Sequence, residues 1–200
     1  RSPVPGGSLV SLDDSAAKSM PGVIDVVKIP ATSVTNMLGE MRASEAVAVV
    51  ADSYWTANSA LQTLEVNWSE TEYDSVSSES IYEQFDRDIS ARIDRTNDRL
   101  EGEVDSAFSR AAKVIDADYH VPFLAHTCME PLNATVDVRE DSAEIWVGCQ
   151  NPLGFRRVVA DFLELDTEKV TLHNHIMGGG FGRKSQQDFV IQAALISKSV

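Results

Sequence analysis

The sequence predicts an α+β protein in which two ordered parts are separated by an acidic connector. β-branched runs, such as AVAVVA at residues 46–51, alternate with helix-like segments that follow Asp or Ser caps. Between residue 69 and about residue 105, Ser, Glu and Asp dominate and apolar side chains are sparse, which is typical of a surface connector. We therefore expect two separately packed lobes, an ordered part over residues 1–70 and a second ordered part over 108–200, joined by a mobile acidic connector over 71–107.

The first part has the pattern of a small α/β unit with two helices packed on a sheet. Asp13 or Asp14 can cap the first helix, and Asp52 or Ser53 can cap the second. A Pro-Gly pair ends the first helix. The pattern predicts strands at residues 8–12, 23–29, 46–51 and 64–68, and helices at residues 15–20 and 54–64.

The secondary-structure signals are weak in the connector and stronger in the second part. The apolar spacing between residues 81 and 100 allows one weak amphipathic helix, and a short helix is expected at 104–112. Beyond it, the pattern predicts a strand at 114–121, a hairpin formed by 133–138 and 144–148, a helix at 153–163, a strand at 170–175 and a final helix at 185–199.

The composition excludes several classes of protein. The formal net charge is −14, so a nucleic-acid partner is not expected, because an acidic surface repels phosphates. No segment approaches the ~20 apolar residues that a membrane-spanning helix needs. Cys128 and Cys149 are too few for an iron–sulfur cluster and do not form a CxxC zinc motif. Two buried free thiols are favoured over a disulfide.

The run Gly178, Gly179, Gly180, Phe181, Gly182, Arg183, Lys184 is the strongest candidate for a binding site. Glycines let a backbone approach a bulky ligand closely, and two cations beside a helix start suit an anionic ligand. The run is neither a GxGxxG fingerprint nor a P-loop. A glycine-rich turn that binds nothing remains the alternative.

Five segments in order give the chain a family resemblance. SLVSLDDSAAKSMPGVIDVV and AVAVVADSYWTANSALQTLEVNWSE lie in the first part, and VPFLAHTCMEPLNATVDV, IWVGCQNP and MGGGFGRKSQQDFV lie in the second. Together they resemble the large molybdopterin-binding subunits of the xanthine dehydrogenase/aldehyde oxidase family, and most closely the isoquinoline 1-oxidoreductase β-subunit branch. The resemblance implies part of an a/b-hammerhead domain at residues 1–70 and the start of a molybdopterin-binding domain at 108–200.

The resemblance also implies a chemistry and a cofactor. Family members hydroxylate an aldehyde or an N-heteroaromatic carbon with oxygen from water, using a molybdopterin cofactor that is commonly the cytosine dinucleotide form in bacteria. Electrons would leave through [2Fe-2S] clusters on a partner subunit. Gln150 matches the glutamine whose amide approaches the apical oxo group of molybdenum. The cofactor-binding residues implied by the loop are Gly178, Gly179, Gly180, Phe181, Gly182 and Arg183.

Some of the residues named above also have simpler structural interpretations. Gln150 is otherwise a satisfied polar residue at a strand end, and Arg183 a solvated surface cation. Ser185 holds the position of a glutamate that orients purines in xanthine-oxidising members, which argues against a purine substrate. Glu130 is expected to be a structural acceptor for backbone donors rather than a catalytic carboxylate. His126 is expected in the core or a pocket wall, and the core is also expected to contain Trp55, Trp68 and Trp146.

The chain begins at Arg1 and stops within a helical run, so we expect a piece of a longer polypeptide. The family's general base, a glutamate nearer the C-terminus of the full subunit, is not in this sequence, and the piece alone is expected to be inactive. The competing hypothesis is a non-catalytic structural or subunit-interaction domain. A carbon-monoxide dehydrogenase is disfavoured because its active-site cysteine loop is not found. The compartment stays open between bacterial cytoplasm and periplasm.

Overall fold

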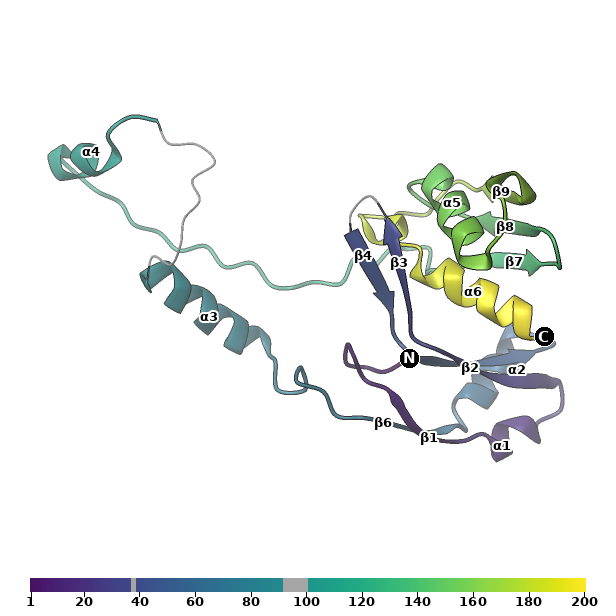
Figure 1. The fold of residues 1–200 in the computed structure, drawn as a ribbon. Helices are drawn as coiled ribbons and strands as arrows, with labels where there is room; N and C mark the ends of the chain where they lie inside the picture. The colour runs from purple at the N-terminus through teal and green to yellow at the C-terminus, as the bar shows by residue number, and fades with distance from the viewer. Residues whose placement is uncertain (37–38, 92–100) are drawn as a thin grey trace. The chain divides into compact units, whose positions relative to one another are not determined.

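The computed structural model describes residues 1–36, 39–91 and 101–200 (Figure 1). The chain divides into two compact units. The first contains Arg1–Asp74 and His126–Val200, and the second contains Ser75–Ala125. The expected connector thus falls mainly in the second unit, and both expected ordered parts contribute to the first. The evolutionary domain boundaries at residues 70 and 107 stay a prediction.

The strands before the connector pair antiparallel in twos. Among the described residues, β1 (Leu9–Asp13) pairs with β6 (Glu65–Trp68), β2 (Val23–Ile29) with β5 (Ala46–Ala51), and β3 (Thr32–Asn36) with β4 (Gly39–Ala43). The strands expected in this part are therefore confirmed, but the single sheet is wrong, because each pair forms a separate two-stranded sheet.

Two short helices accompany these strands, as expected. They are α1 (Ser15–Lys18) and α2 (Tyr54–Leu61). The Ser53 hydroxyl accepts a hydrogen bond from the Thr56 N–H at 3.1 Å and so caps α2. Trp55 in α2 is 76% exposed, and its expected place in the core is wrong. The β3–β4 hairpin was not predicted, because its strands mix Thr, Ser, Glu and Arg without an apolar face.

A mixed three-stranded sheet follows the connector. Its order is β7 (Thr135–Val138), β8 (Ala143–Val147), β9 (Val170–Asn174), with β7–β8 antiparallel and β8–β9 parallel. The parallel pair needs a crossover, which α5 (Pro152–Leu163) supplies together with the short 3-10 turn η1 (Thr167–Lys169). The hairpin, the helix and the last strand are close to their predicted bounds.

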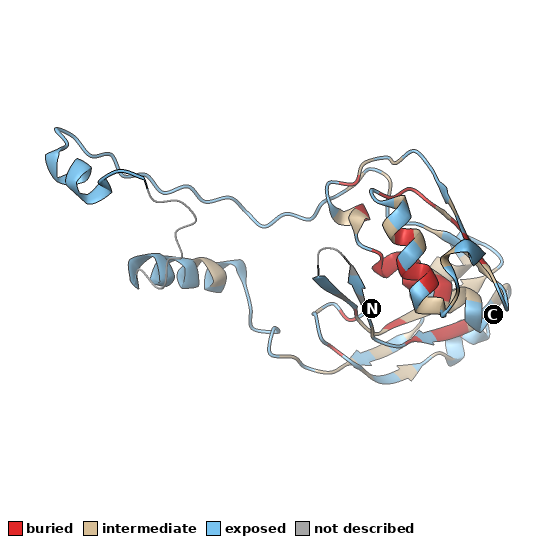
Figure 2. Cartoon of the chain, turned by 45° about the horizontal axis from the view of Figure 1, so that its top comes forward, coloured by how far each residue is buried: buried red, intermediate tan, exposed pale blue. Residues whose placement is uncertain are grey.

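The final helix, α6 (Asp188–Ser199), packs against two separate clusters of apolar residues. Its Phe189, Val190 and Ile191 belong to the core formed with β8, β9 and α5. Leu195 and Ile196 pack against Val27, Ile29 and Ala46 of β2 and β5. The sections before and after the connector therefore form one compact unit, and Figure 2 shows its buried residues gathered in these strands and helices. The expectation of two separately packed lobes is wrong, because α6, after the connector, packs on β2 and β5, before it.

The second unit carries α3 (Ser78–Ala91) and α4 (Val104–Arg110), and none of its described residues is buried (Figure 2). Both expected helices are present, although residues 92–100 of the first expectation lie outside the described residues. The strand expected at 114–121 is wrong, because this segment has no ladder partner among the described residues and stays exposed, with Tyr119 at 90%. Over the described ranges, the helices are too short and too polar to span a membrane.

Candidate functional site

The glycine loop, residues 178–184, connects β9 with the short 3-10 helix η2 (Arg183–Ser185), which leads into α6. Gly179 and Gly182 have φ values of +98° and +91°, a region that favours glycine. A Cβ on Gly180 would lie 2.5 Å from the Gln150 Oε1, and a Cβ on Gly178 would lie 2.6 Å from the Glu130 Cβ. Backbone conformation thus favours glycine at Gly179 and Gly182, and close approach to Glu130 favours it at Gly178. A Cβ at Gly180 would displace the Gln150 side chain.

Gln150 follows β8 and is fixed to the loop by two hydrogen bonds. Its backbone N–H donates to the Lys184 carbonyl at 3.0 Å, and its side-chain Oε1 accepts from the Gly182 N–H at 2.9 Å. Because only the amide oxygen can accept from an N–H, Oε1 is fixed toward Gly182 and the Nε2 donors point away from it. The structure therefore brings Gln150 and the glycine loop together, as the sequence predicts, and leaves the amide donors for another partner.

Glu130 lies under the loop as a structural acceptor. Its Oε2 accepts from the Gly178 N–H at 2.9 Å, and its own N–H donates to the Gly178 carbonyl at 3.1 Å. The same oxygen contacts the Lys184 Nζ, which is buried with 2% of its side chain exposed. The hydrogen bond from Lys184, together with those from Gly178 and Asn133, lowers the pKa of Glu130 from 4.5 to about 2. The expectation that Glu130 accepts from a neighbouring backbone donor is confirmed.

The two cationic side chains of the loop, Arg183 and Lys184, form ion pairs with carboxylates of the same chain. Arg183 makes a two-pronged ion pair with Asp188, with Nη–Oδ distances of 2.8 and 2.7 Å. Asp188 is buried and also contacts the Arg1 guanidinium at 3.2 Å. Burial by itself raises the pKa of Asp188, but the hydrogen bonds and charges of Arg183 and Arg1 outweigh it and lower this pKa. The positive charge expected at the loop is therefore neutralised by Asp188 and Glu130.

Apolar side chains and open backbone face outward at the loop. Phe181 is 73% exposed, Met129 is 92% exposed and Ile176 is 99% exposed. No heavy atom lies within 4 Å of a Cβ built on Gly182, so the loop backbone is accessible there. The open space at Gly182, the exposed Gln150 side chain and the exposed ring of Phe181 suit a flat cofactor with polar edges. The residues present therefore fit the molybdopterin group that the resemblance implies.

Both cysteines are free, as predicted, but only Cys149 is buried as expected. Cys149 is buried, its Sγ lies 3.5 Å from the Asn174 Oδ1, and burial raises the pKa of its thiol. Cys128 is half-buried, and its Sγ donates to the Gly180 carbonyl at 3.5 Å. No group of three His, Cys, Asp or Glu side chains that could hold a metal ion is found within 1–36, 39–91 and 101–200.

Besides Trp55, three expected core positions differ from prediction, and one of these, Trp68 in β6, is half-buried. His126 is exposed, because it lies in an irregular segment rather than in the core. Trp146 is half-buried and stacks on His173 across the β8–β9 pair, with ring centroids 5.2 Å apart. The His173 Nε2 in turn lies 2.8 Å from the Glu144 Oε1. These three residues line the outer face of the sheet, away from the core residues of β8.

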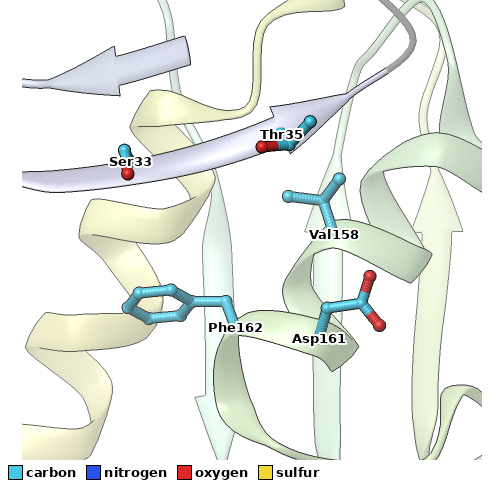
Figure 3. A pocket seen from close by; sticks show the side chains of 5 residues that line it. All are labelled: Ser33, Thr35, Val158, Asp161 and Phe162. Carbon is cyan, nitrogen blue, oxygen red and sulfur yellow. The ribbon is translucent and has the colours of Figure 1, made fainter. Parts of the chain in front are cut away.

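A hollow between β3 and α5 is not the candidate site. It has a volume of about 310 Å³ and is lined by Ser33, Thr35, Val158, Asp161 and Phe162 (Figure 3). None of these residues belongs to the glycine loop or neighbours Gln150. A single carboxylate beside two hydroxyls and two apolar side chains offers no constellation for chemistry.

Sequence reasoning did not foresee the contact between Glu130 and Lys184. The residues are 54 positions apart, and neither has a local pattern that predicts a buried pair. The one available signal was a lysine next to a run of glycines and ahead of an apolar helix. That pattern also fits an exposed cation.

Comparison with known proteins shows which family this sequence resembles. The molybdopterin cofactor-binding domain matches residues 85–200. Among curated relatives, a membrane-bound aldehyde dehydrogenase [pyrroloquinoline-quinone] of Gluconacetobacter polyoxogenes is 30% identical over 98% of this chain and 24% of its own length. The isoquinoline 1-oxidoreductase subunit beta of Brevundimonas diminuta is 28% identical over 99% of this chain and 25% of its own.

A solved structure supports the fold. Quinoline 2-oxidoreductase from Pseudomonas putida 86 matches with a TM-score of 0.66 at 21% identity, over 96% of this chain and 28% of that chain. The chain thus spans about a quarter of the length of these relatives. Since the cofactor-binding domain covers more than half of the sequence, the chain belongs to the xanthine dehydrogenase/aldehyde oxidase family of molybdopterin-binding subunits.

Proposed function

We propose that this chain is part of the large subunit of a molybdenum hydroxylase, which oxidises an aldehyde or an N-heteroaromatic compound. The observation that carries the proposal is Gln150, whose amide oxygen is held by the Gly182 N–H, so that its Nε2 donors point away from Gly182. This arrangement lies inside the segment that matches the cofactor-binding domain. Residues 1–70 would then belong to an a/b-hammerhead domain.

The overall reaction defines what the protein has to support. A C–H bond of the substrate is replaced by C–OH, water provides the oxygen, and two electrons and two protons are released. When bound, the molybdenum cofactor accepts the two electrons at the metal. We propose the cytosine dinucleotide form, and we propose [2Fe-2S] clusters on a partner subunit as the next electron acceptor.

Individual residues would contribute by position and hydrogen bonding. The Gln150 Nε2 would donate to the polar edge of the metal centre, where a preorganised donor stabilises developing negative charge. Gly178, Gly179, Gly180 and Gly182 would let the backbone lie against the pterin, with Phe181 covering it. Arg183, held by Asp188, would contribute by fixing the end of the loop.

A second cofactor deserves a test because of one relative. The Gluconacetobacter protein bears pyrroloquinoline-quinone in its name, and it matches nearly the whole chain. The cofactor-binding domain that matches residues 85–200 favours molybdopterin. A non-catalytic interaction domain is the remaining alternative.

The test is to purify the complete assembled protein and to measure bound molybdenum by mass spectrometry, bound quinone by absorbance and released cytidine monophosphate after acid treatment. The proposal requires about one molybdenum per chain and oxidation of an aldehyde or N-heterocycle. Quinone without molybdenum would establish the second cofactor, and neither group would favour the interaction domain. The 200-residue chain alone is expected to show no turnover, because it spans only a quarter of its relatives. Dye-linked oxidation by this chain would contradict that expectation.

A further inference from the structure

Lys184 is the most deeply buried charged side chain near the loop, and its positive charge has to be compensated by nearby groups. The residue is 1% exposed, within the 3-10 turn that follows the glycines. A buried ammonium group is costly unless a carboxylate and hydrogen bonds compensate it. The Glu130 Oε2 contacts its Nζ and supplies that compensation.

The carboxylate of Glu130 holds both ends of the glycine loop at once. Through Oε2 it contacts Lys184 at the end of the loop and accepts the Gly178 N–H at 2.9 Å at its start. The Glu130 N–H and the Gly178 carbonyl add a second bond of 3.1 Å. One side chain therefore closes a seven-residue loop that contains four glycines, whose backbones would otherwise have wide conformational freedom.

The closed loop is also what orients Gln150. The Lys184 carbonyl accepts the Gln150 N–H, and the Gly182 N–H donates to the Gln150 Oε1. Gly180 lies so close that a Cβ there would contact the same amide. The two hydrogen bonds that orient Gln150 thus come from backbone atoms of the loop that Glu130 closes.

We propose that Glu130 and Lys184 form a clamp that closes the glycine loop and, through it, aims the Gln150 amide at the cofactor. Both are positioning residues, which touch neither substrate nor cofactor and act through Gln150. The aim toward a cofactor rests on the proposed function, whereas the closure of the loop does not.

The first experiment measures amide hydrogen exchange by NMR in the 200-residue chain, in which no cofactor is needed. Lys184→Met removes the ammonium and keeps the length of the side chain. We expect exchange at Gly178, Gln150 and Gly182 to accelerate about tenfold or more, as local opening does, while Val27 and Ile145 exchange at the parental rate. The matched control is Lys169→Met, which removes an exposed lysine that lies 3.5 Å from Asp141 and should change none of these amides.

A second variant covers the case in which Lys184→Met does not fold. Glu130→Gln keeps the shape of the side chain and an acceptor for Gly178, but it leaves the Lys184 charge uncompensated. It should open the Gln150 and Gly182 amides selectively as well. Unchanged exchange at Gln150 and Gly182 would overturn the clamp. Equal acceleration at Val27 and Ile145 would also overturn it, since the pair would then stabilise the whole unit without controlling the loop.

The second experiment tests the aiming in the complete assembled enzyme. Lys184→Met should retain molybdenum and lower kcat by about tenfold to a hundredfold, because a donor displaced by an ångström loses much of its effect, while KM changes little. Parental kcat in the fully loaded variant would overturn the aiming. If the amides open selectively but neither the parental protein nor the variant contains molybdenum, the proposed function fails and the loop closure stands.

Discussion

Gly180 lies so close to the Gln150 side chain that any side chain at position 180 would have to displace the amide. A methyl group on Gly180 would approach the Gln150 Oε1 to 2.5 Å and its Cδ to 2.9 Å. The glycine run was recognisable as a candidate site from its own pattern, whereas Gln150 was placed in the same site only by the family resemblance. The sequence could not predict that Lys184 is buried or that Arg183 pairs with Asp188. Those contacts depend on how distant segments pack.

Gln150→Ala in the complete enzyme is expected to lower turnover about tenfold to a thousandfold, as the loss of one preorganised donor does. KM should change less, since the lost bond is made to the cofactor and not to the substrate. Steady-state kinetics with parallel molybdenum analysis measures both. A fully loaded variant that turns over at the parental rate would show that Gln150 is only a structural residue at the end of β8.

Gly180→Ala should reduce turnover through Gln150, because the new methyl group displaces the amide rather than the backbone. In the Gln150→Ala background the same substitution should add little, since the clashing atoms are gone. The double-mutant cycle, measured on kcat, should therefore give strong non-additivity. Additive losses would mean that Gly180→Ala disturbs the loop by another route.

At the scale of elements, strongly patterned segments were predicted well and partner-dependent ones were not. The β-branched runs of β2 and β5 and the capped helices α2 and α5 lie close to their expected bounds. The β3–β4 hairpin was missed because it has no apolar alternation. Residues 114–121 have a strand-like sequence, but a strand needs a hydrogen-bonded neighbour, and sequence alone does not reveal whether one is present. The sequence of α6 likewise did not predict that this helix contacts two separate apolar clusters.

Because Leu195 of α6 contacts both cores, Leu195→Ala should destabilise both sections of the first unit together. The expected loss in free energy of unfolding is about 2 kcal/mol, at the low end for a leucine that is only partly buried. Urea unfolding followed by Trp68 fluorescence and by Trp146 fluorescence, each with the other tryptophans replaced by Phe, gives separate probes of the two sections. Both midpoints should coincide and fall together. A shift of the Trp146 midpoint alone would show that α6 does not couple the sections.

On the scale of the whole molecule, the two units differ in how they are stabilised. The first has three clusters of buried apolar residues, whereas the described part of the second has no buried residue. The composition shift at residue 69 predicted this contrast. It placed the end of the exposed region near residue 107, while the second unit continues to Ala125, because the segment after α4 is apolar in sequence but unpacked in this chain.

Limited trypsin digestion should therefore cut first in the second unit, at exposed sites such as Arg110 and Lys113. Since α6 lies after the connector and packs on β2 and β5 before it, the two products should stay associated. Denaturing gels should show two pieces, and size-exclusion chromatography should show them migrating as one particle. Glu-C protease, which cuts after acidic residues, provides a control for site availability and should give the same pattern. A first cut between β5 and α2, or separation of the pieces without denaturant, would contradict the single core around α6.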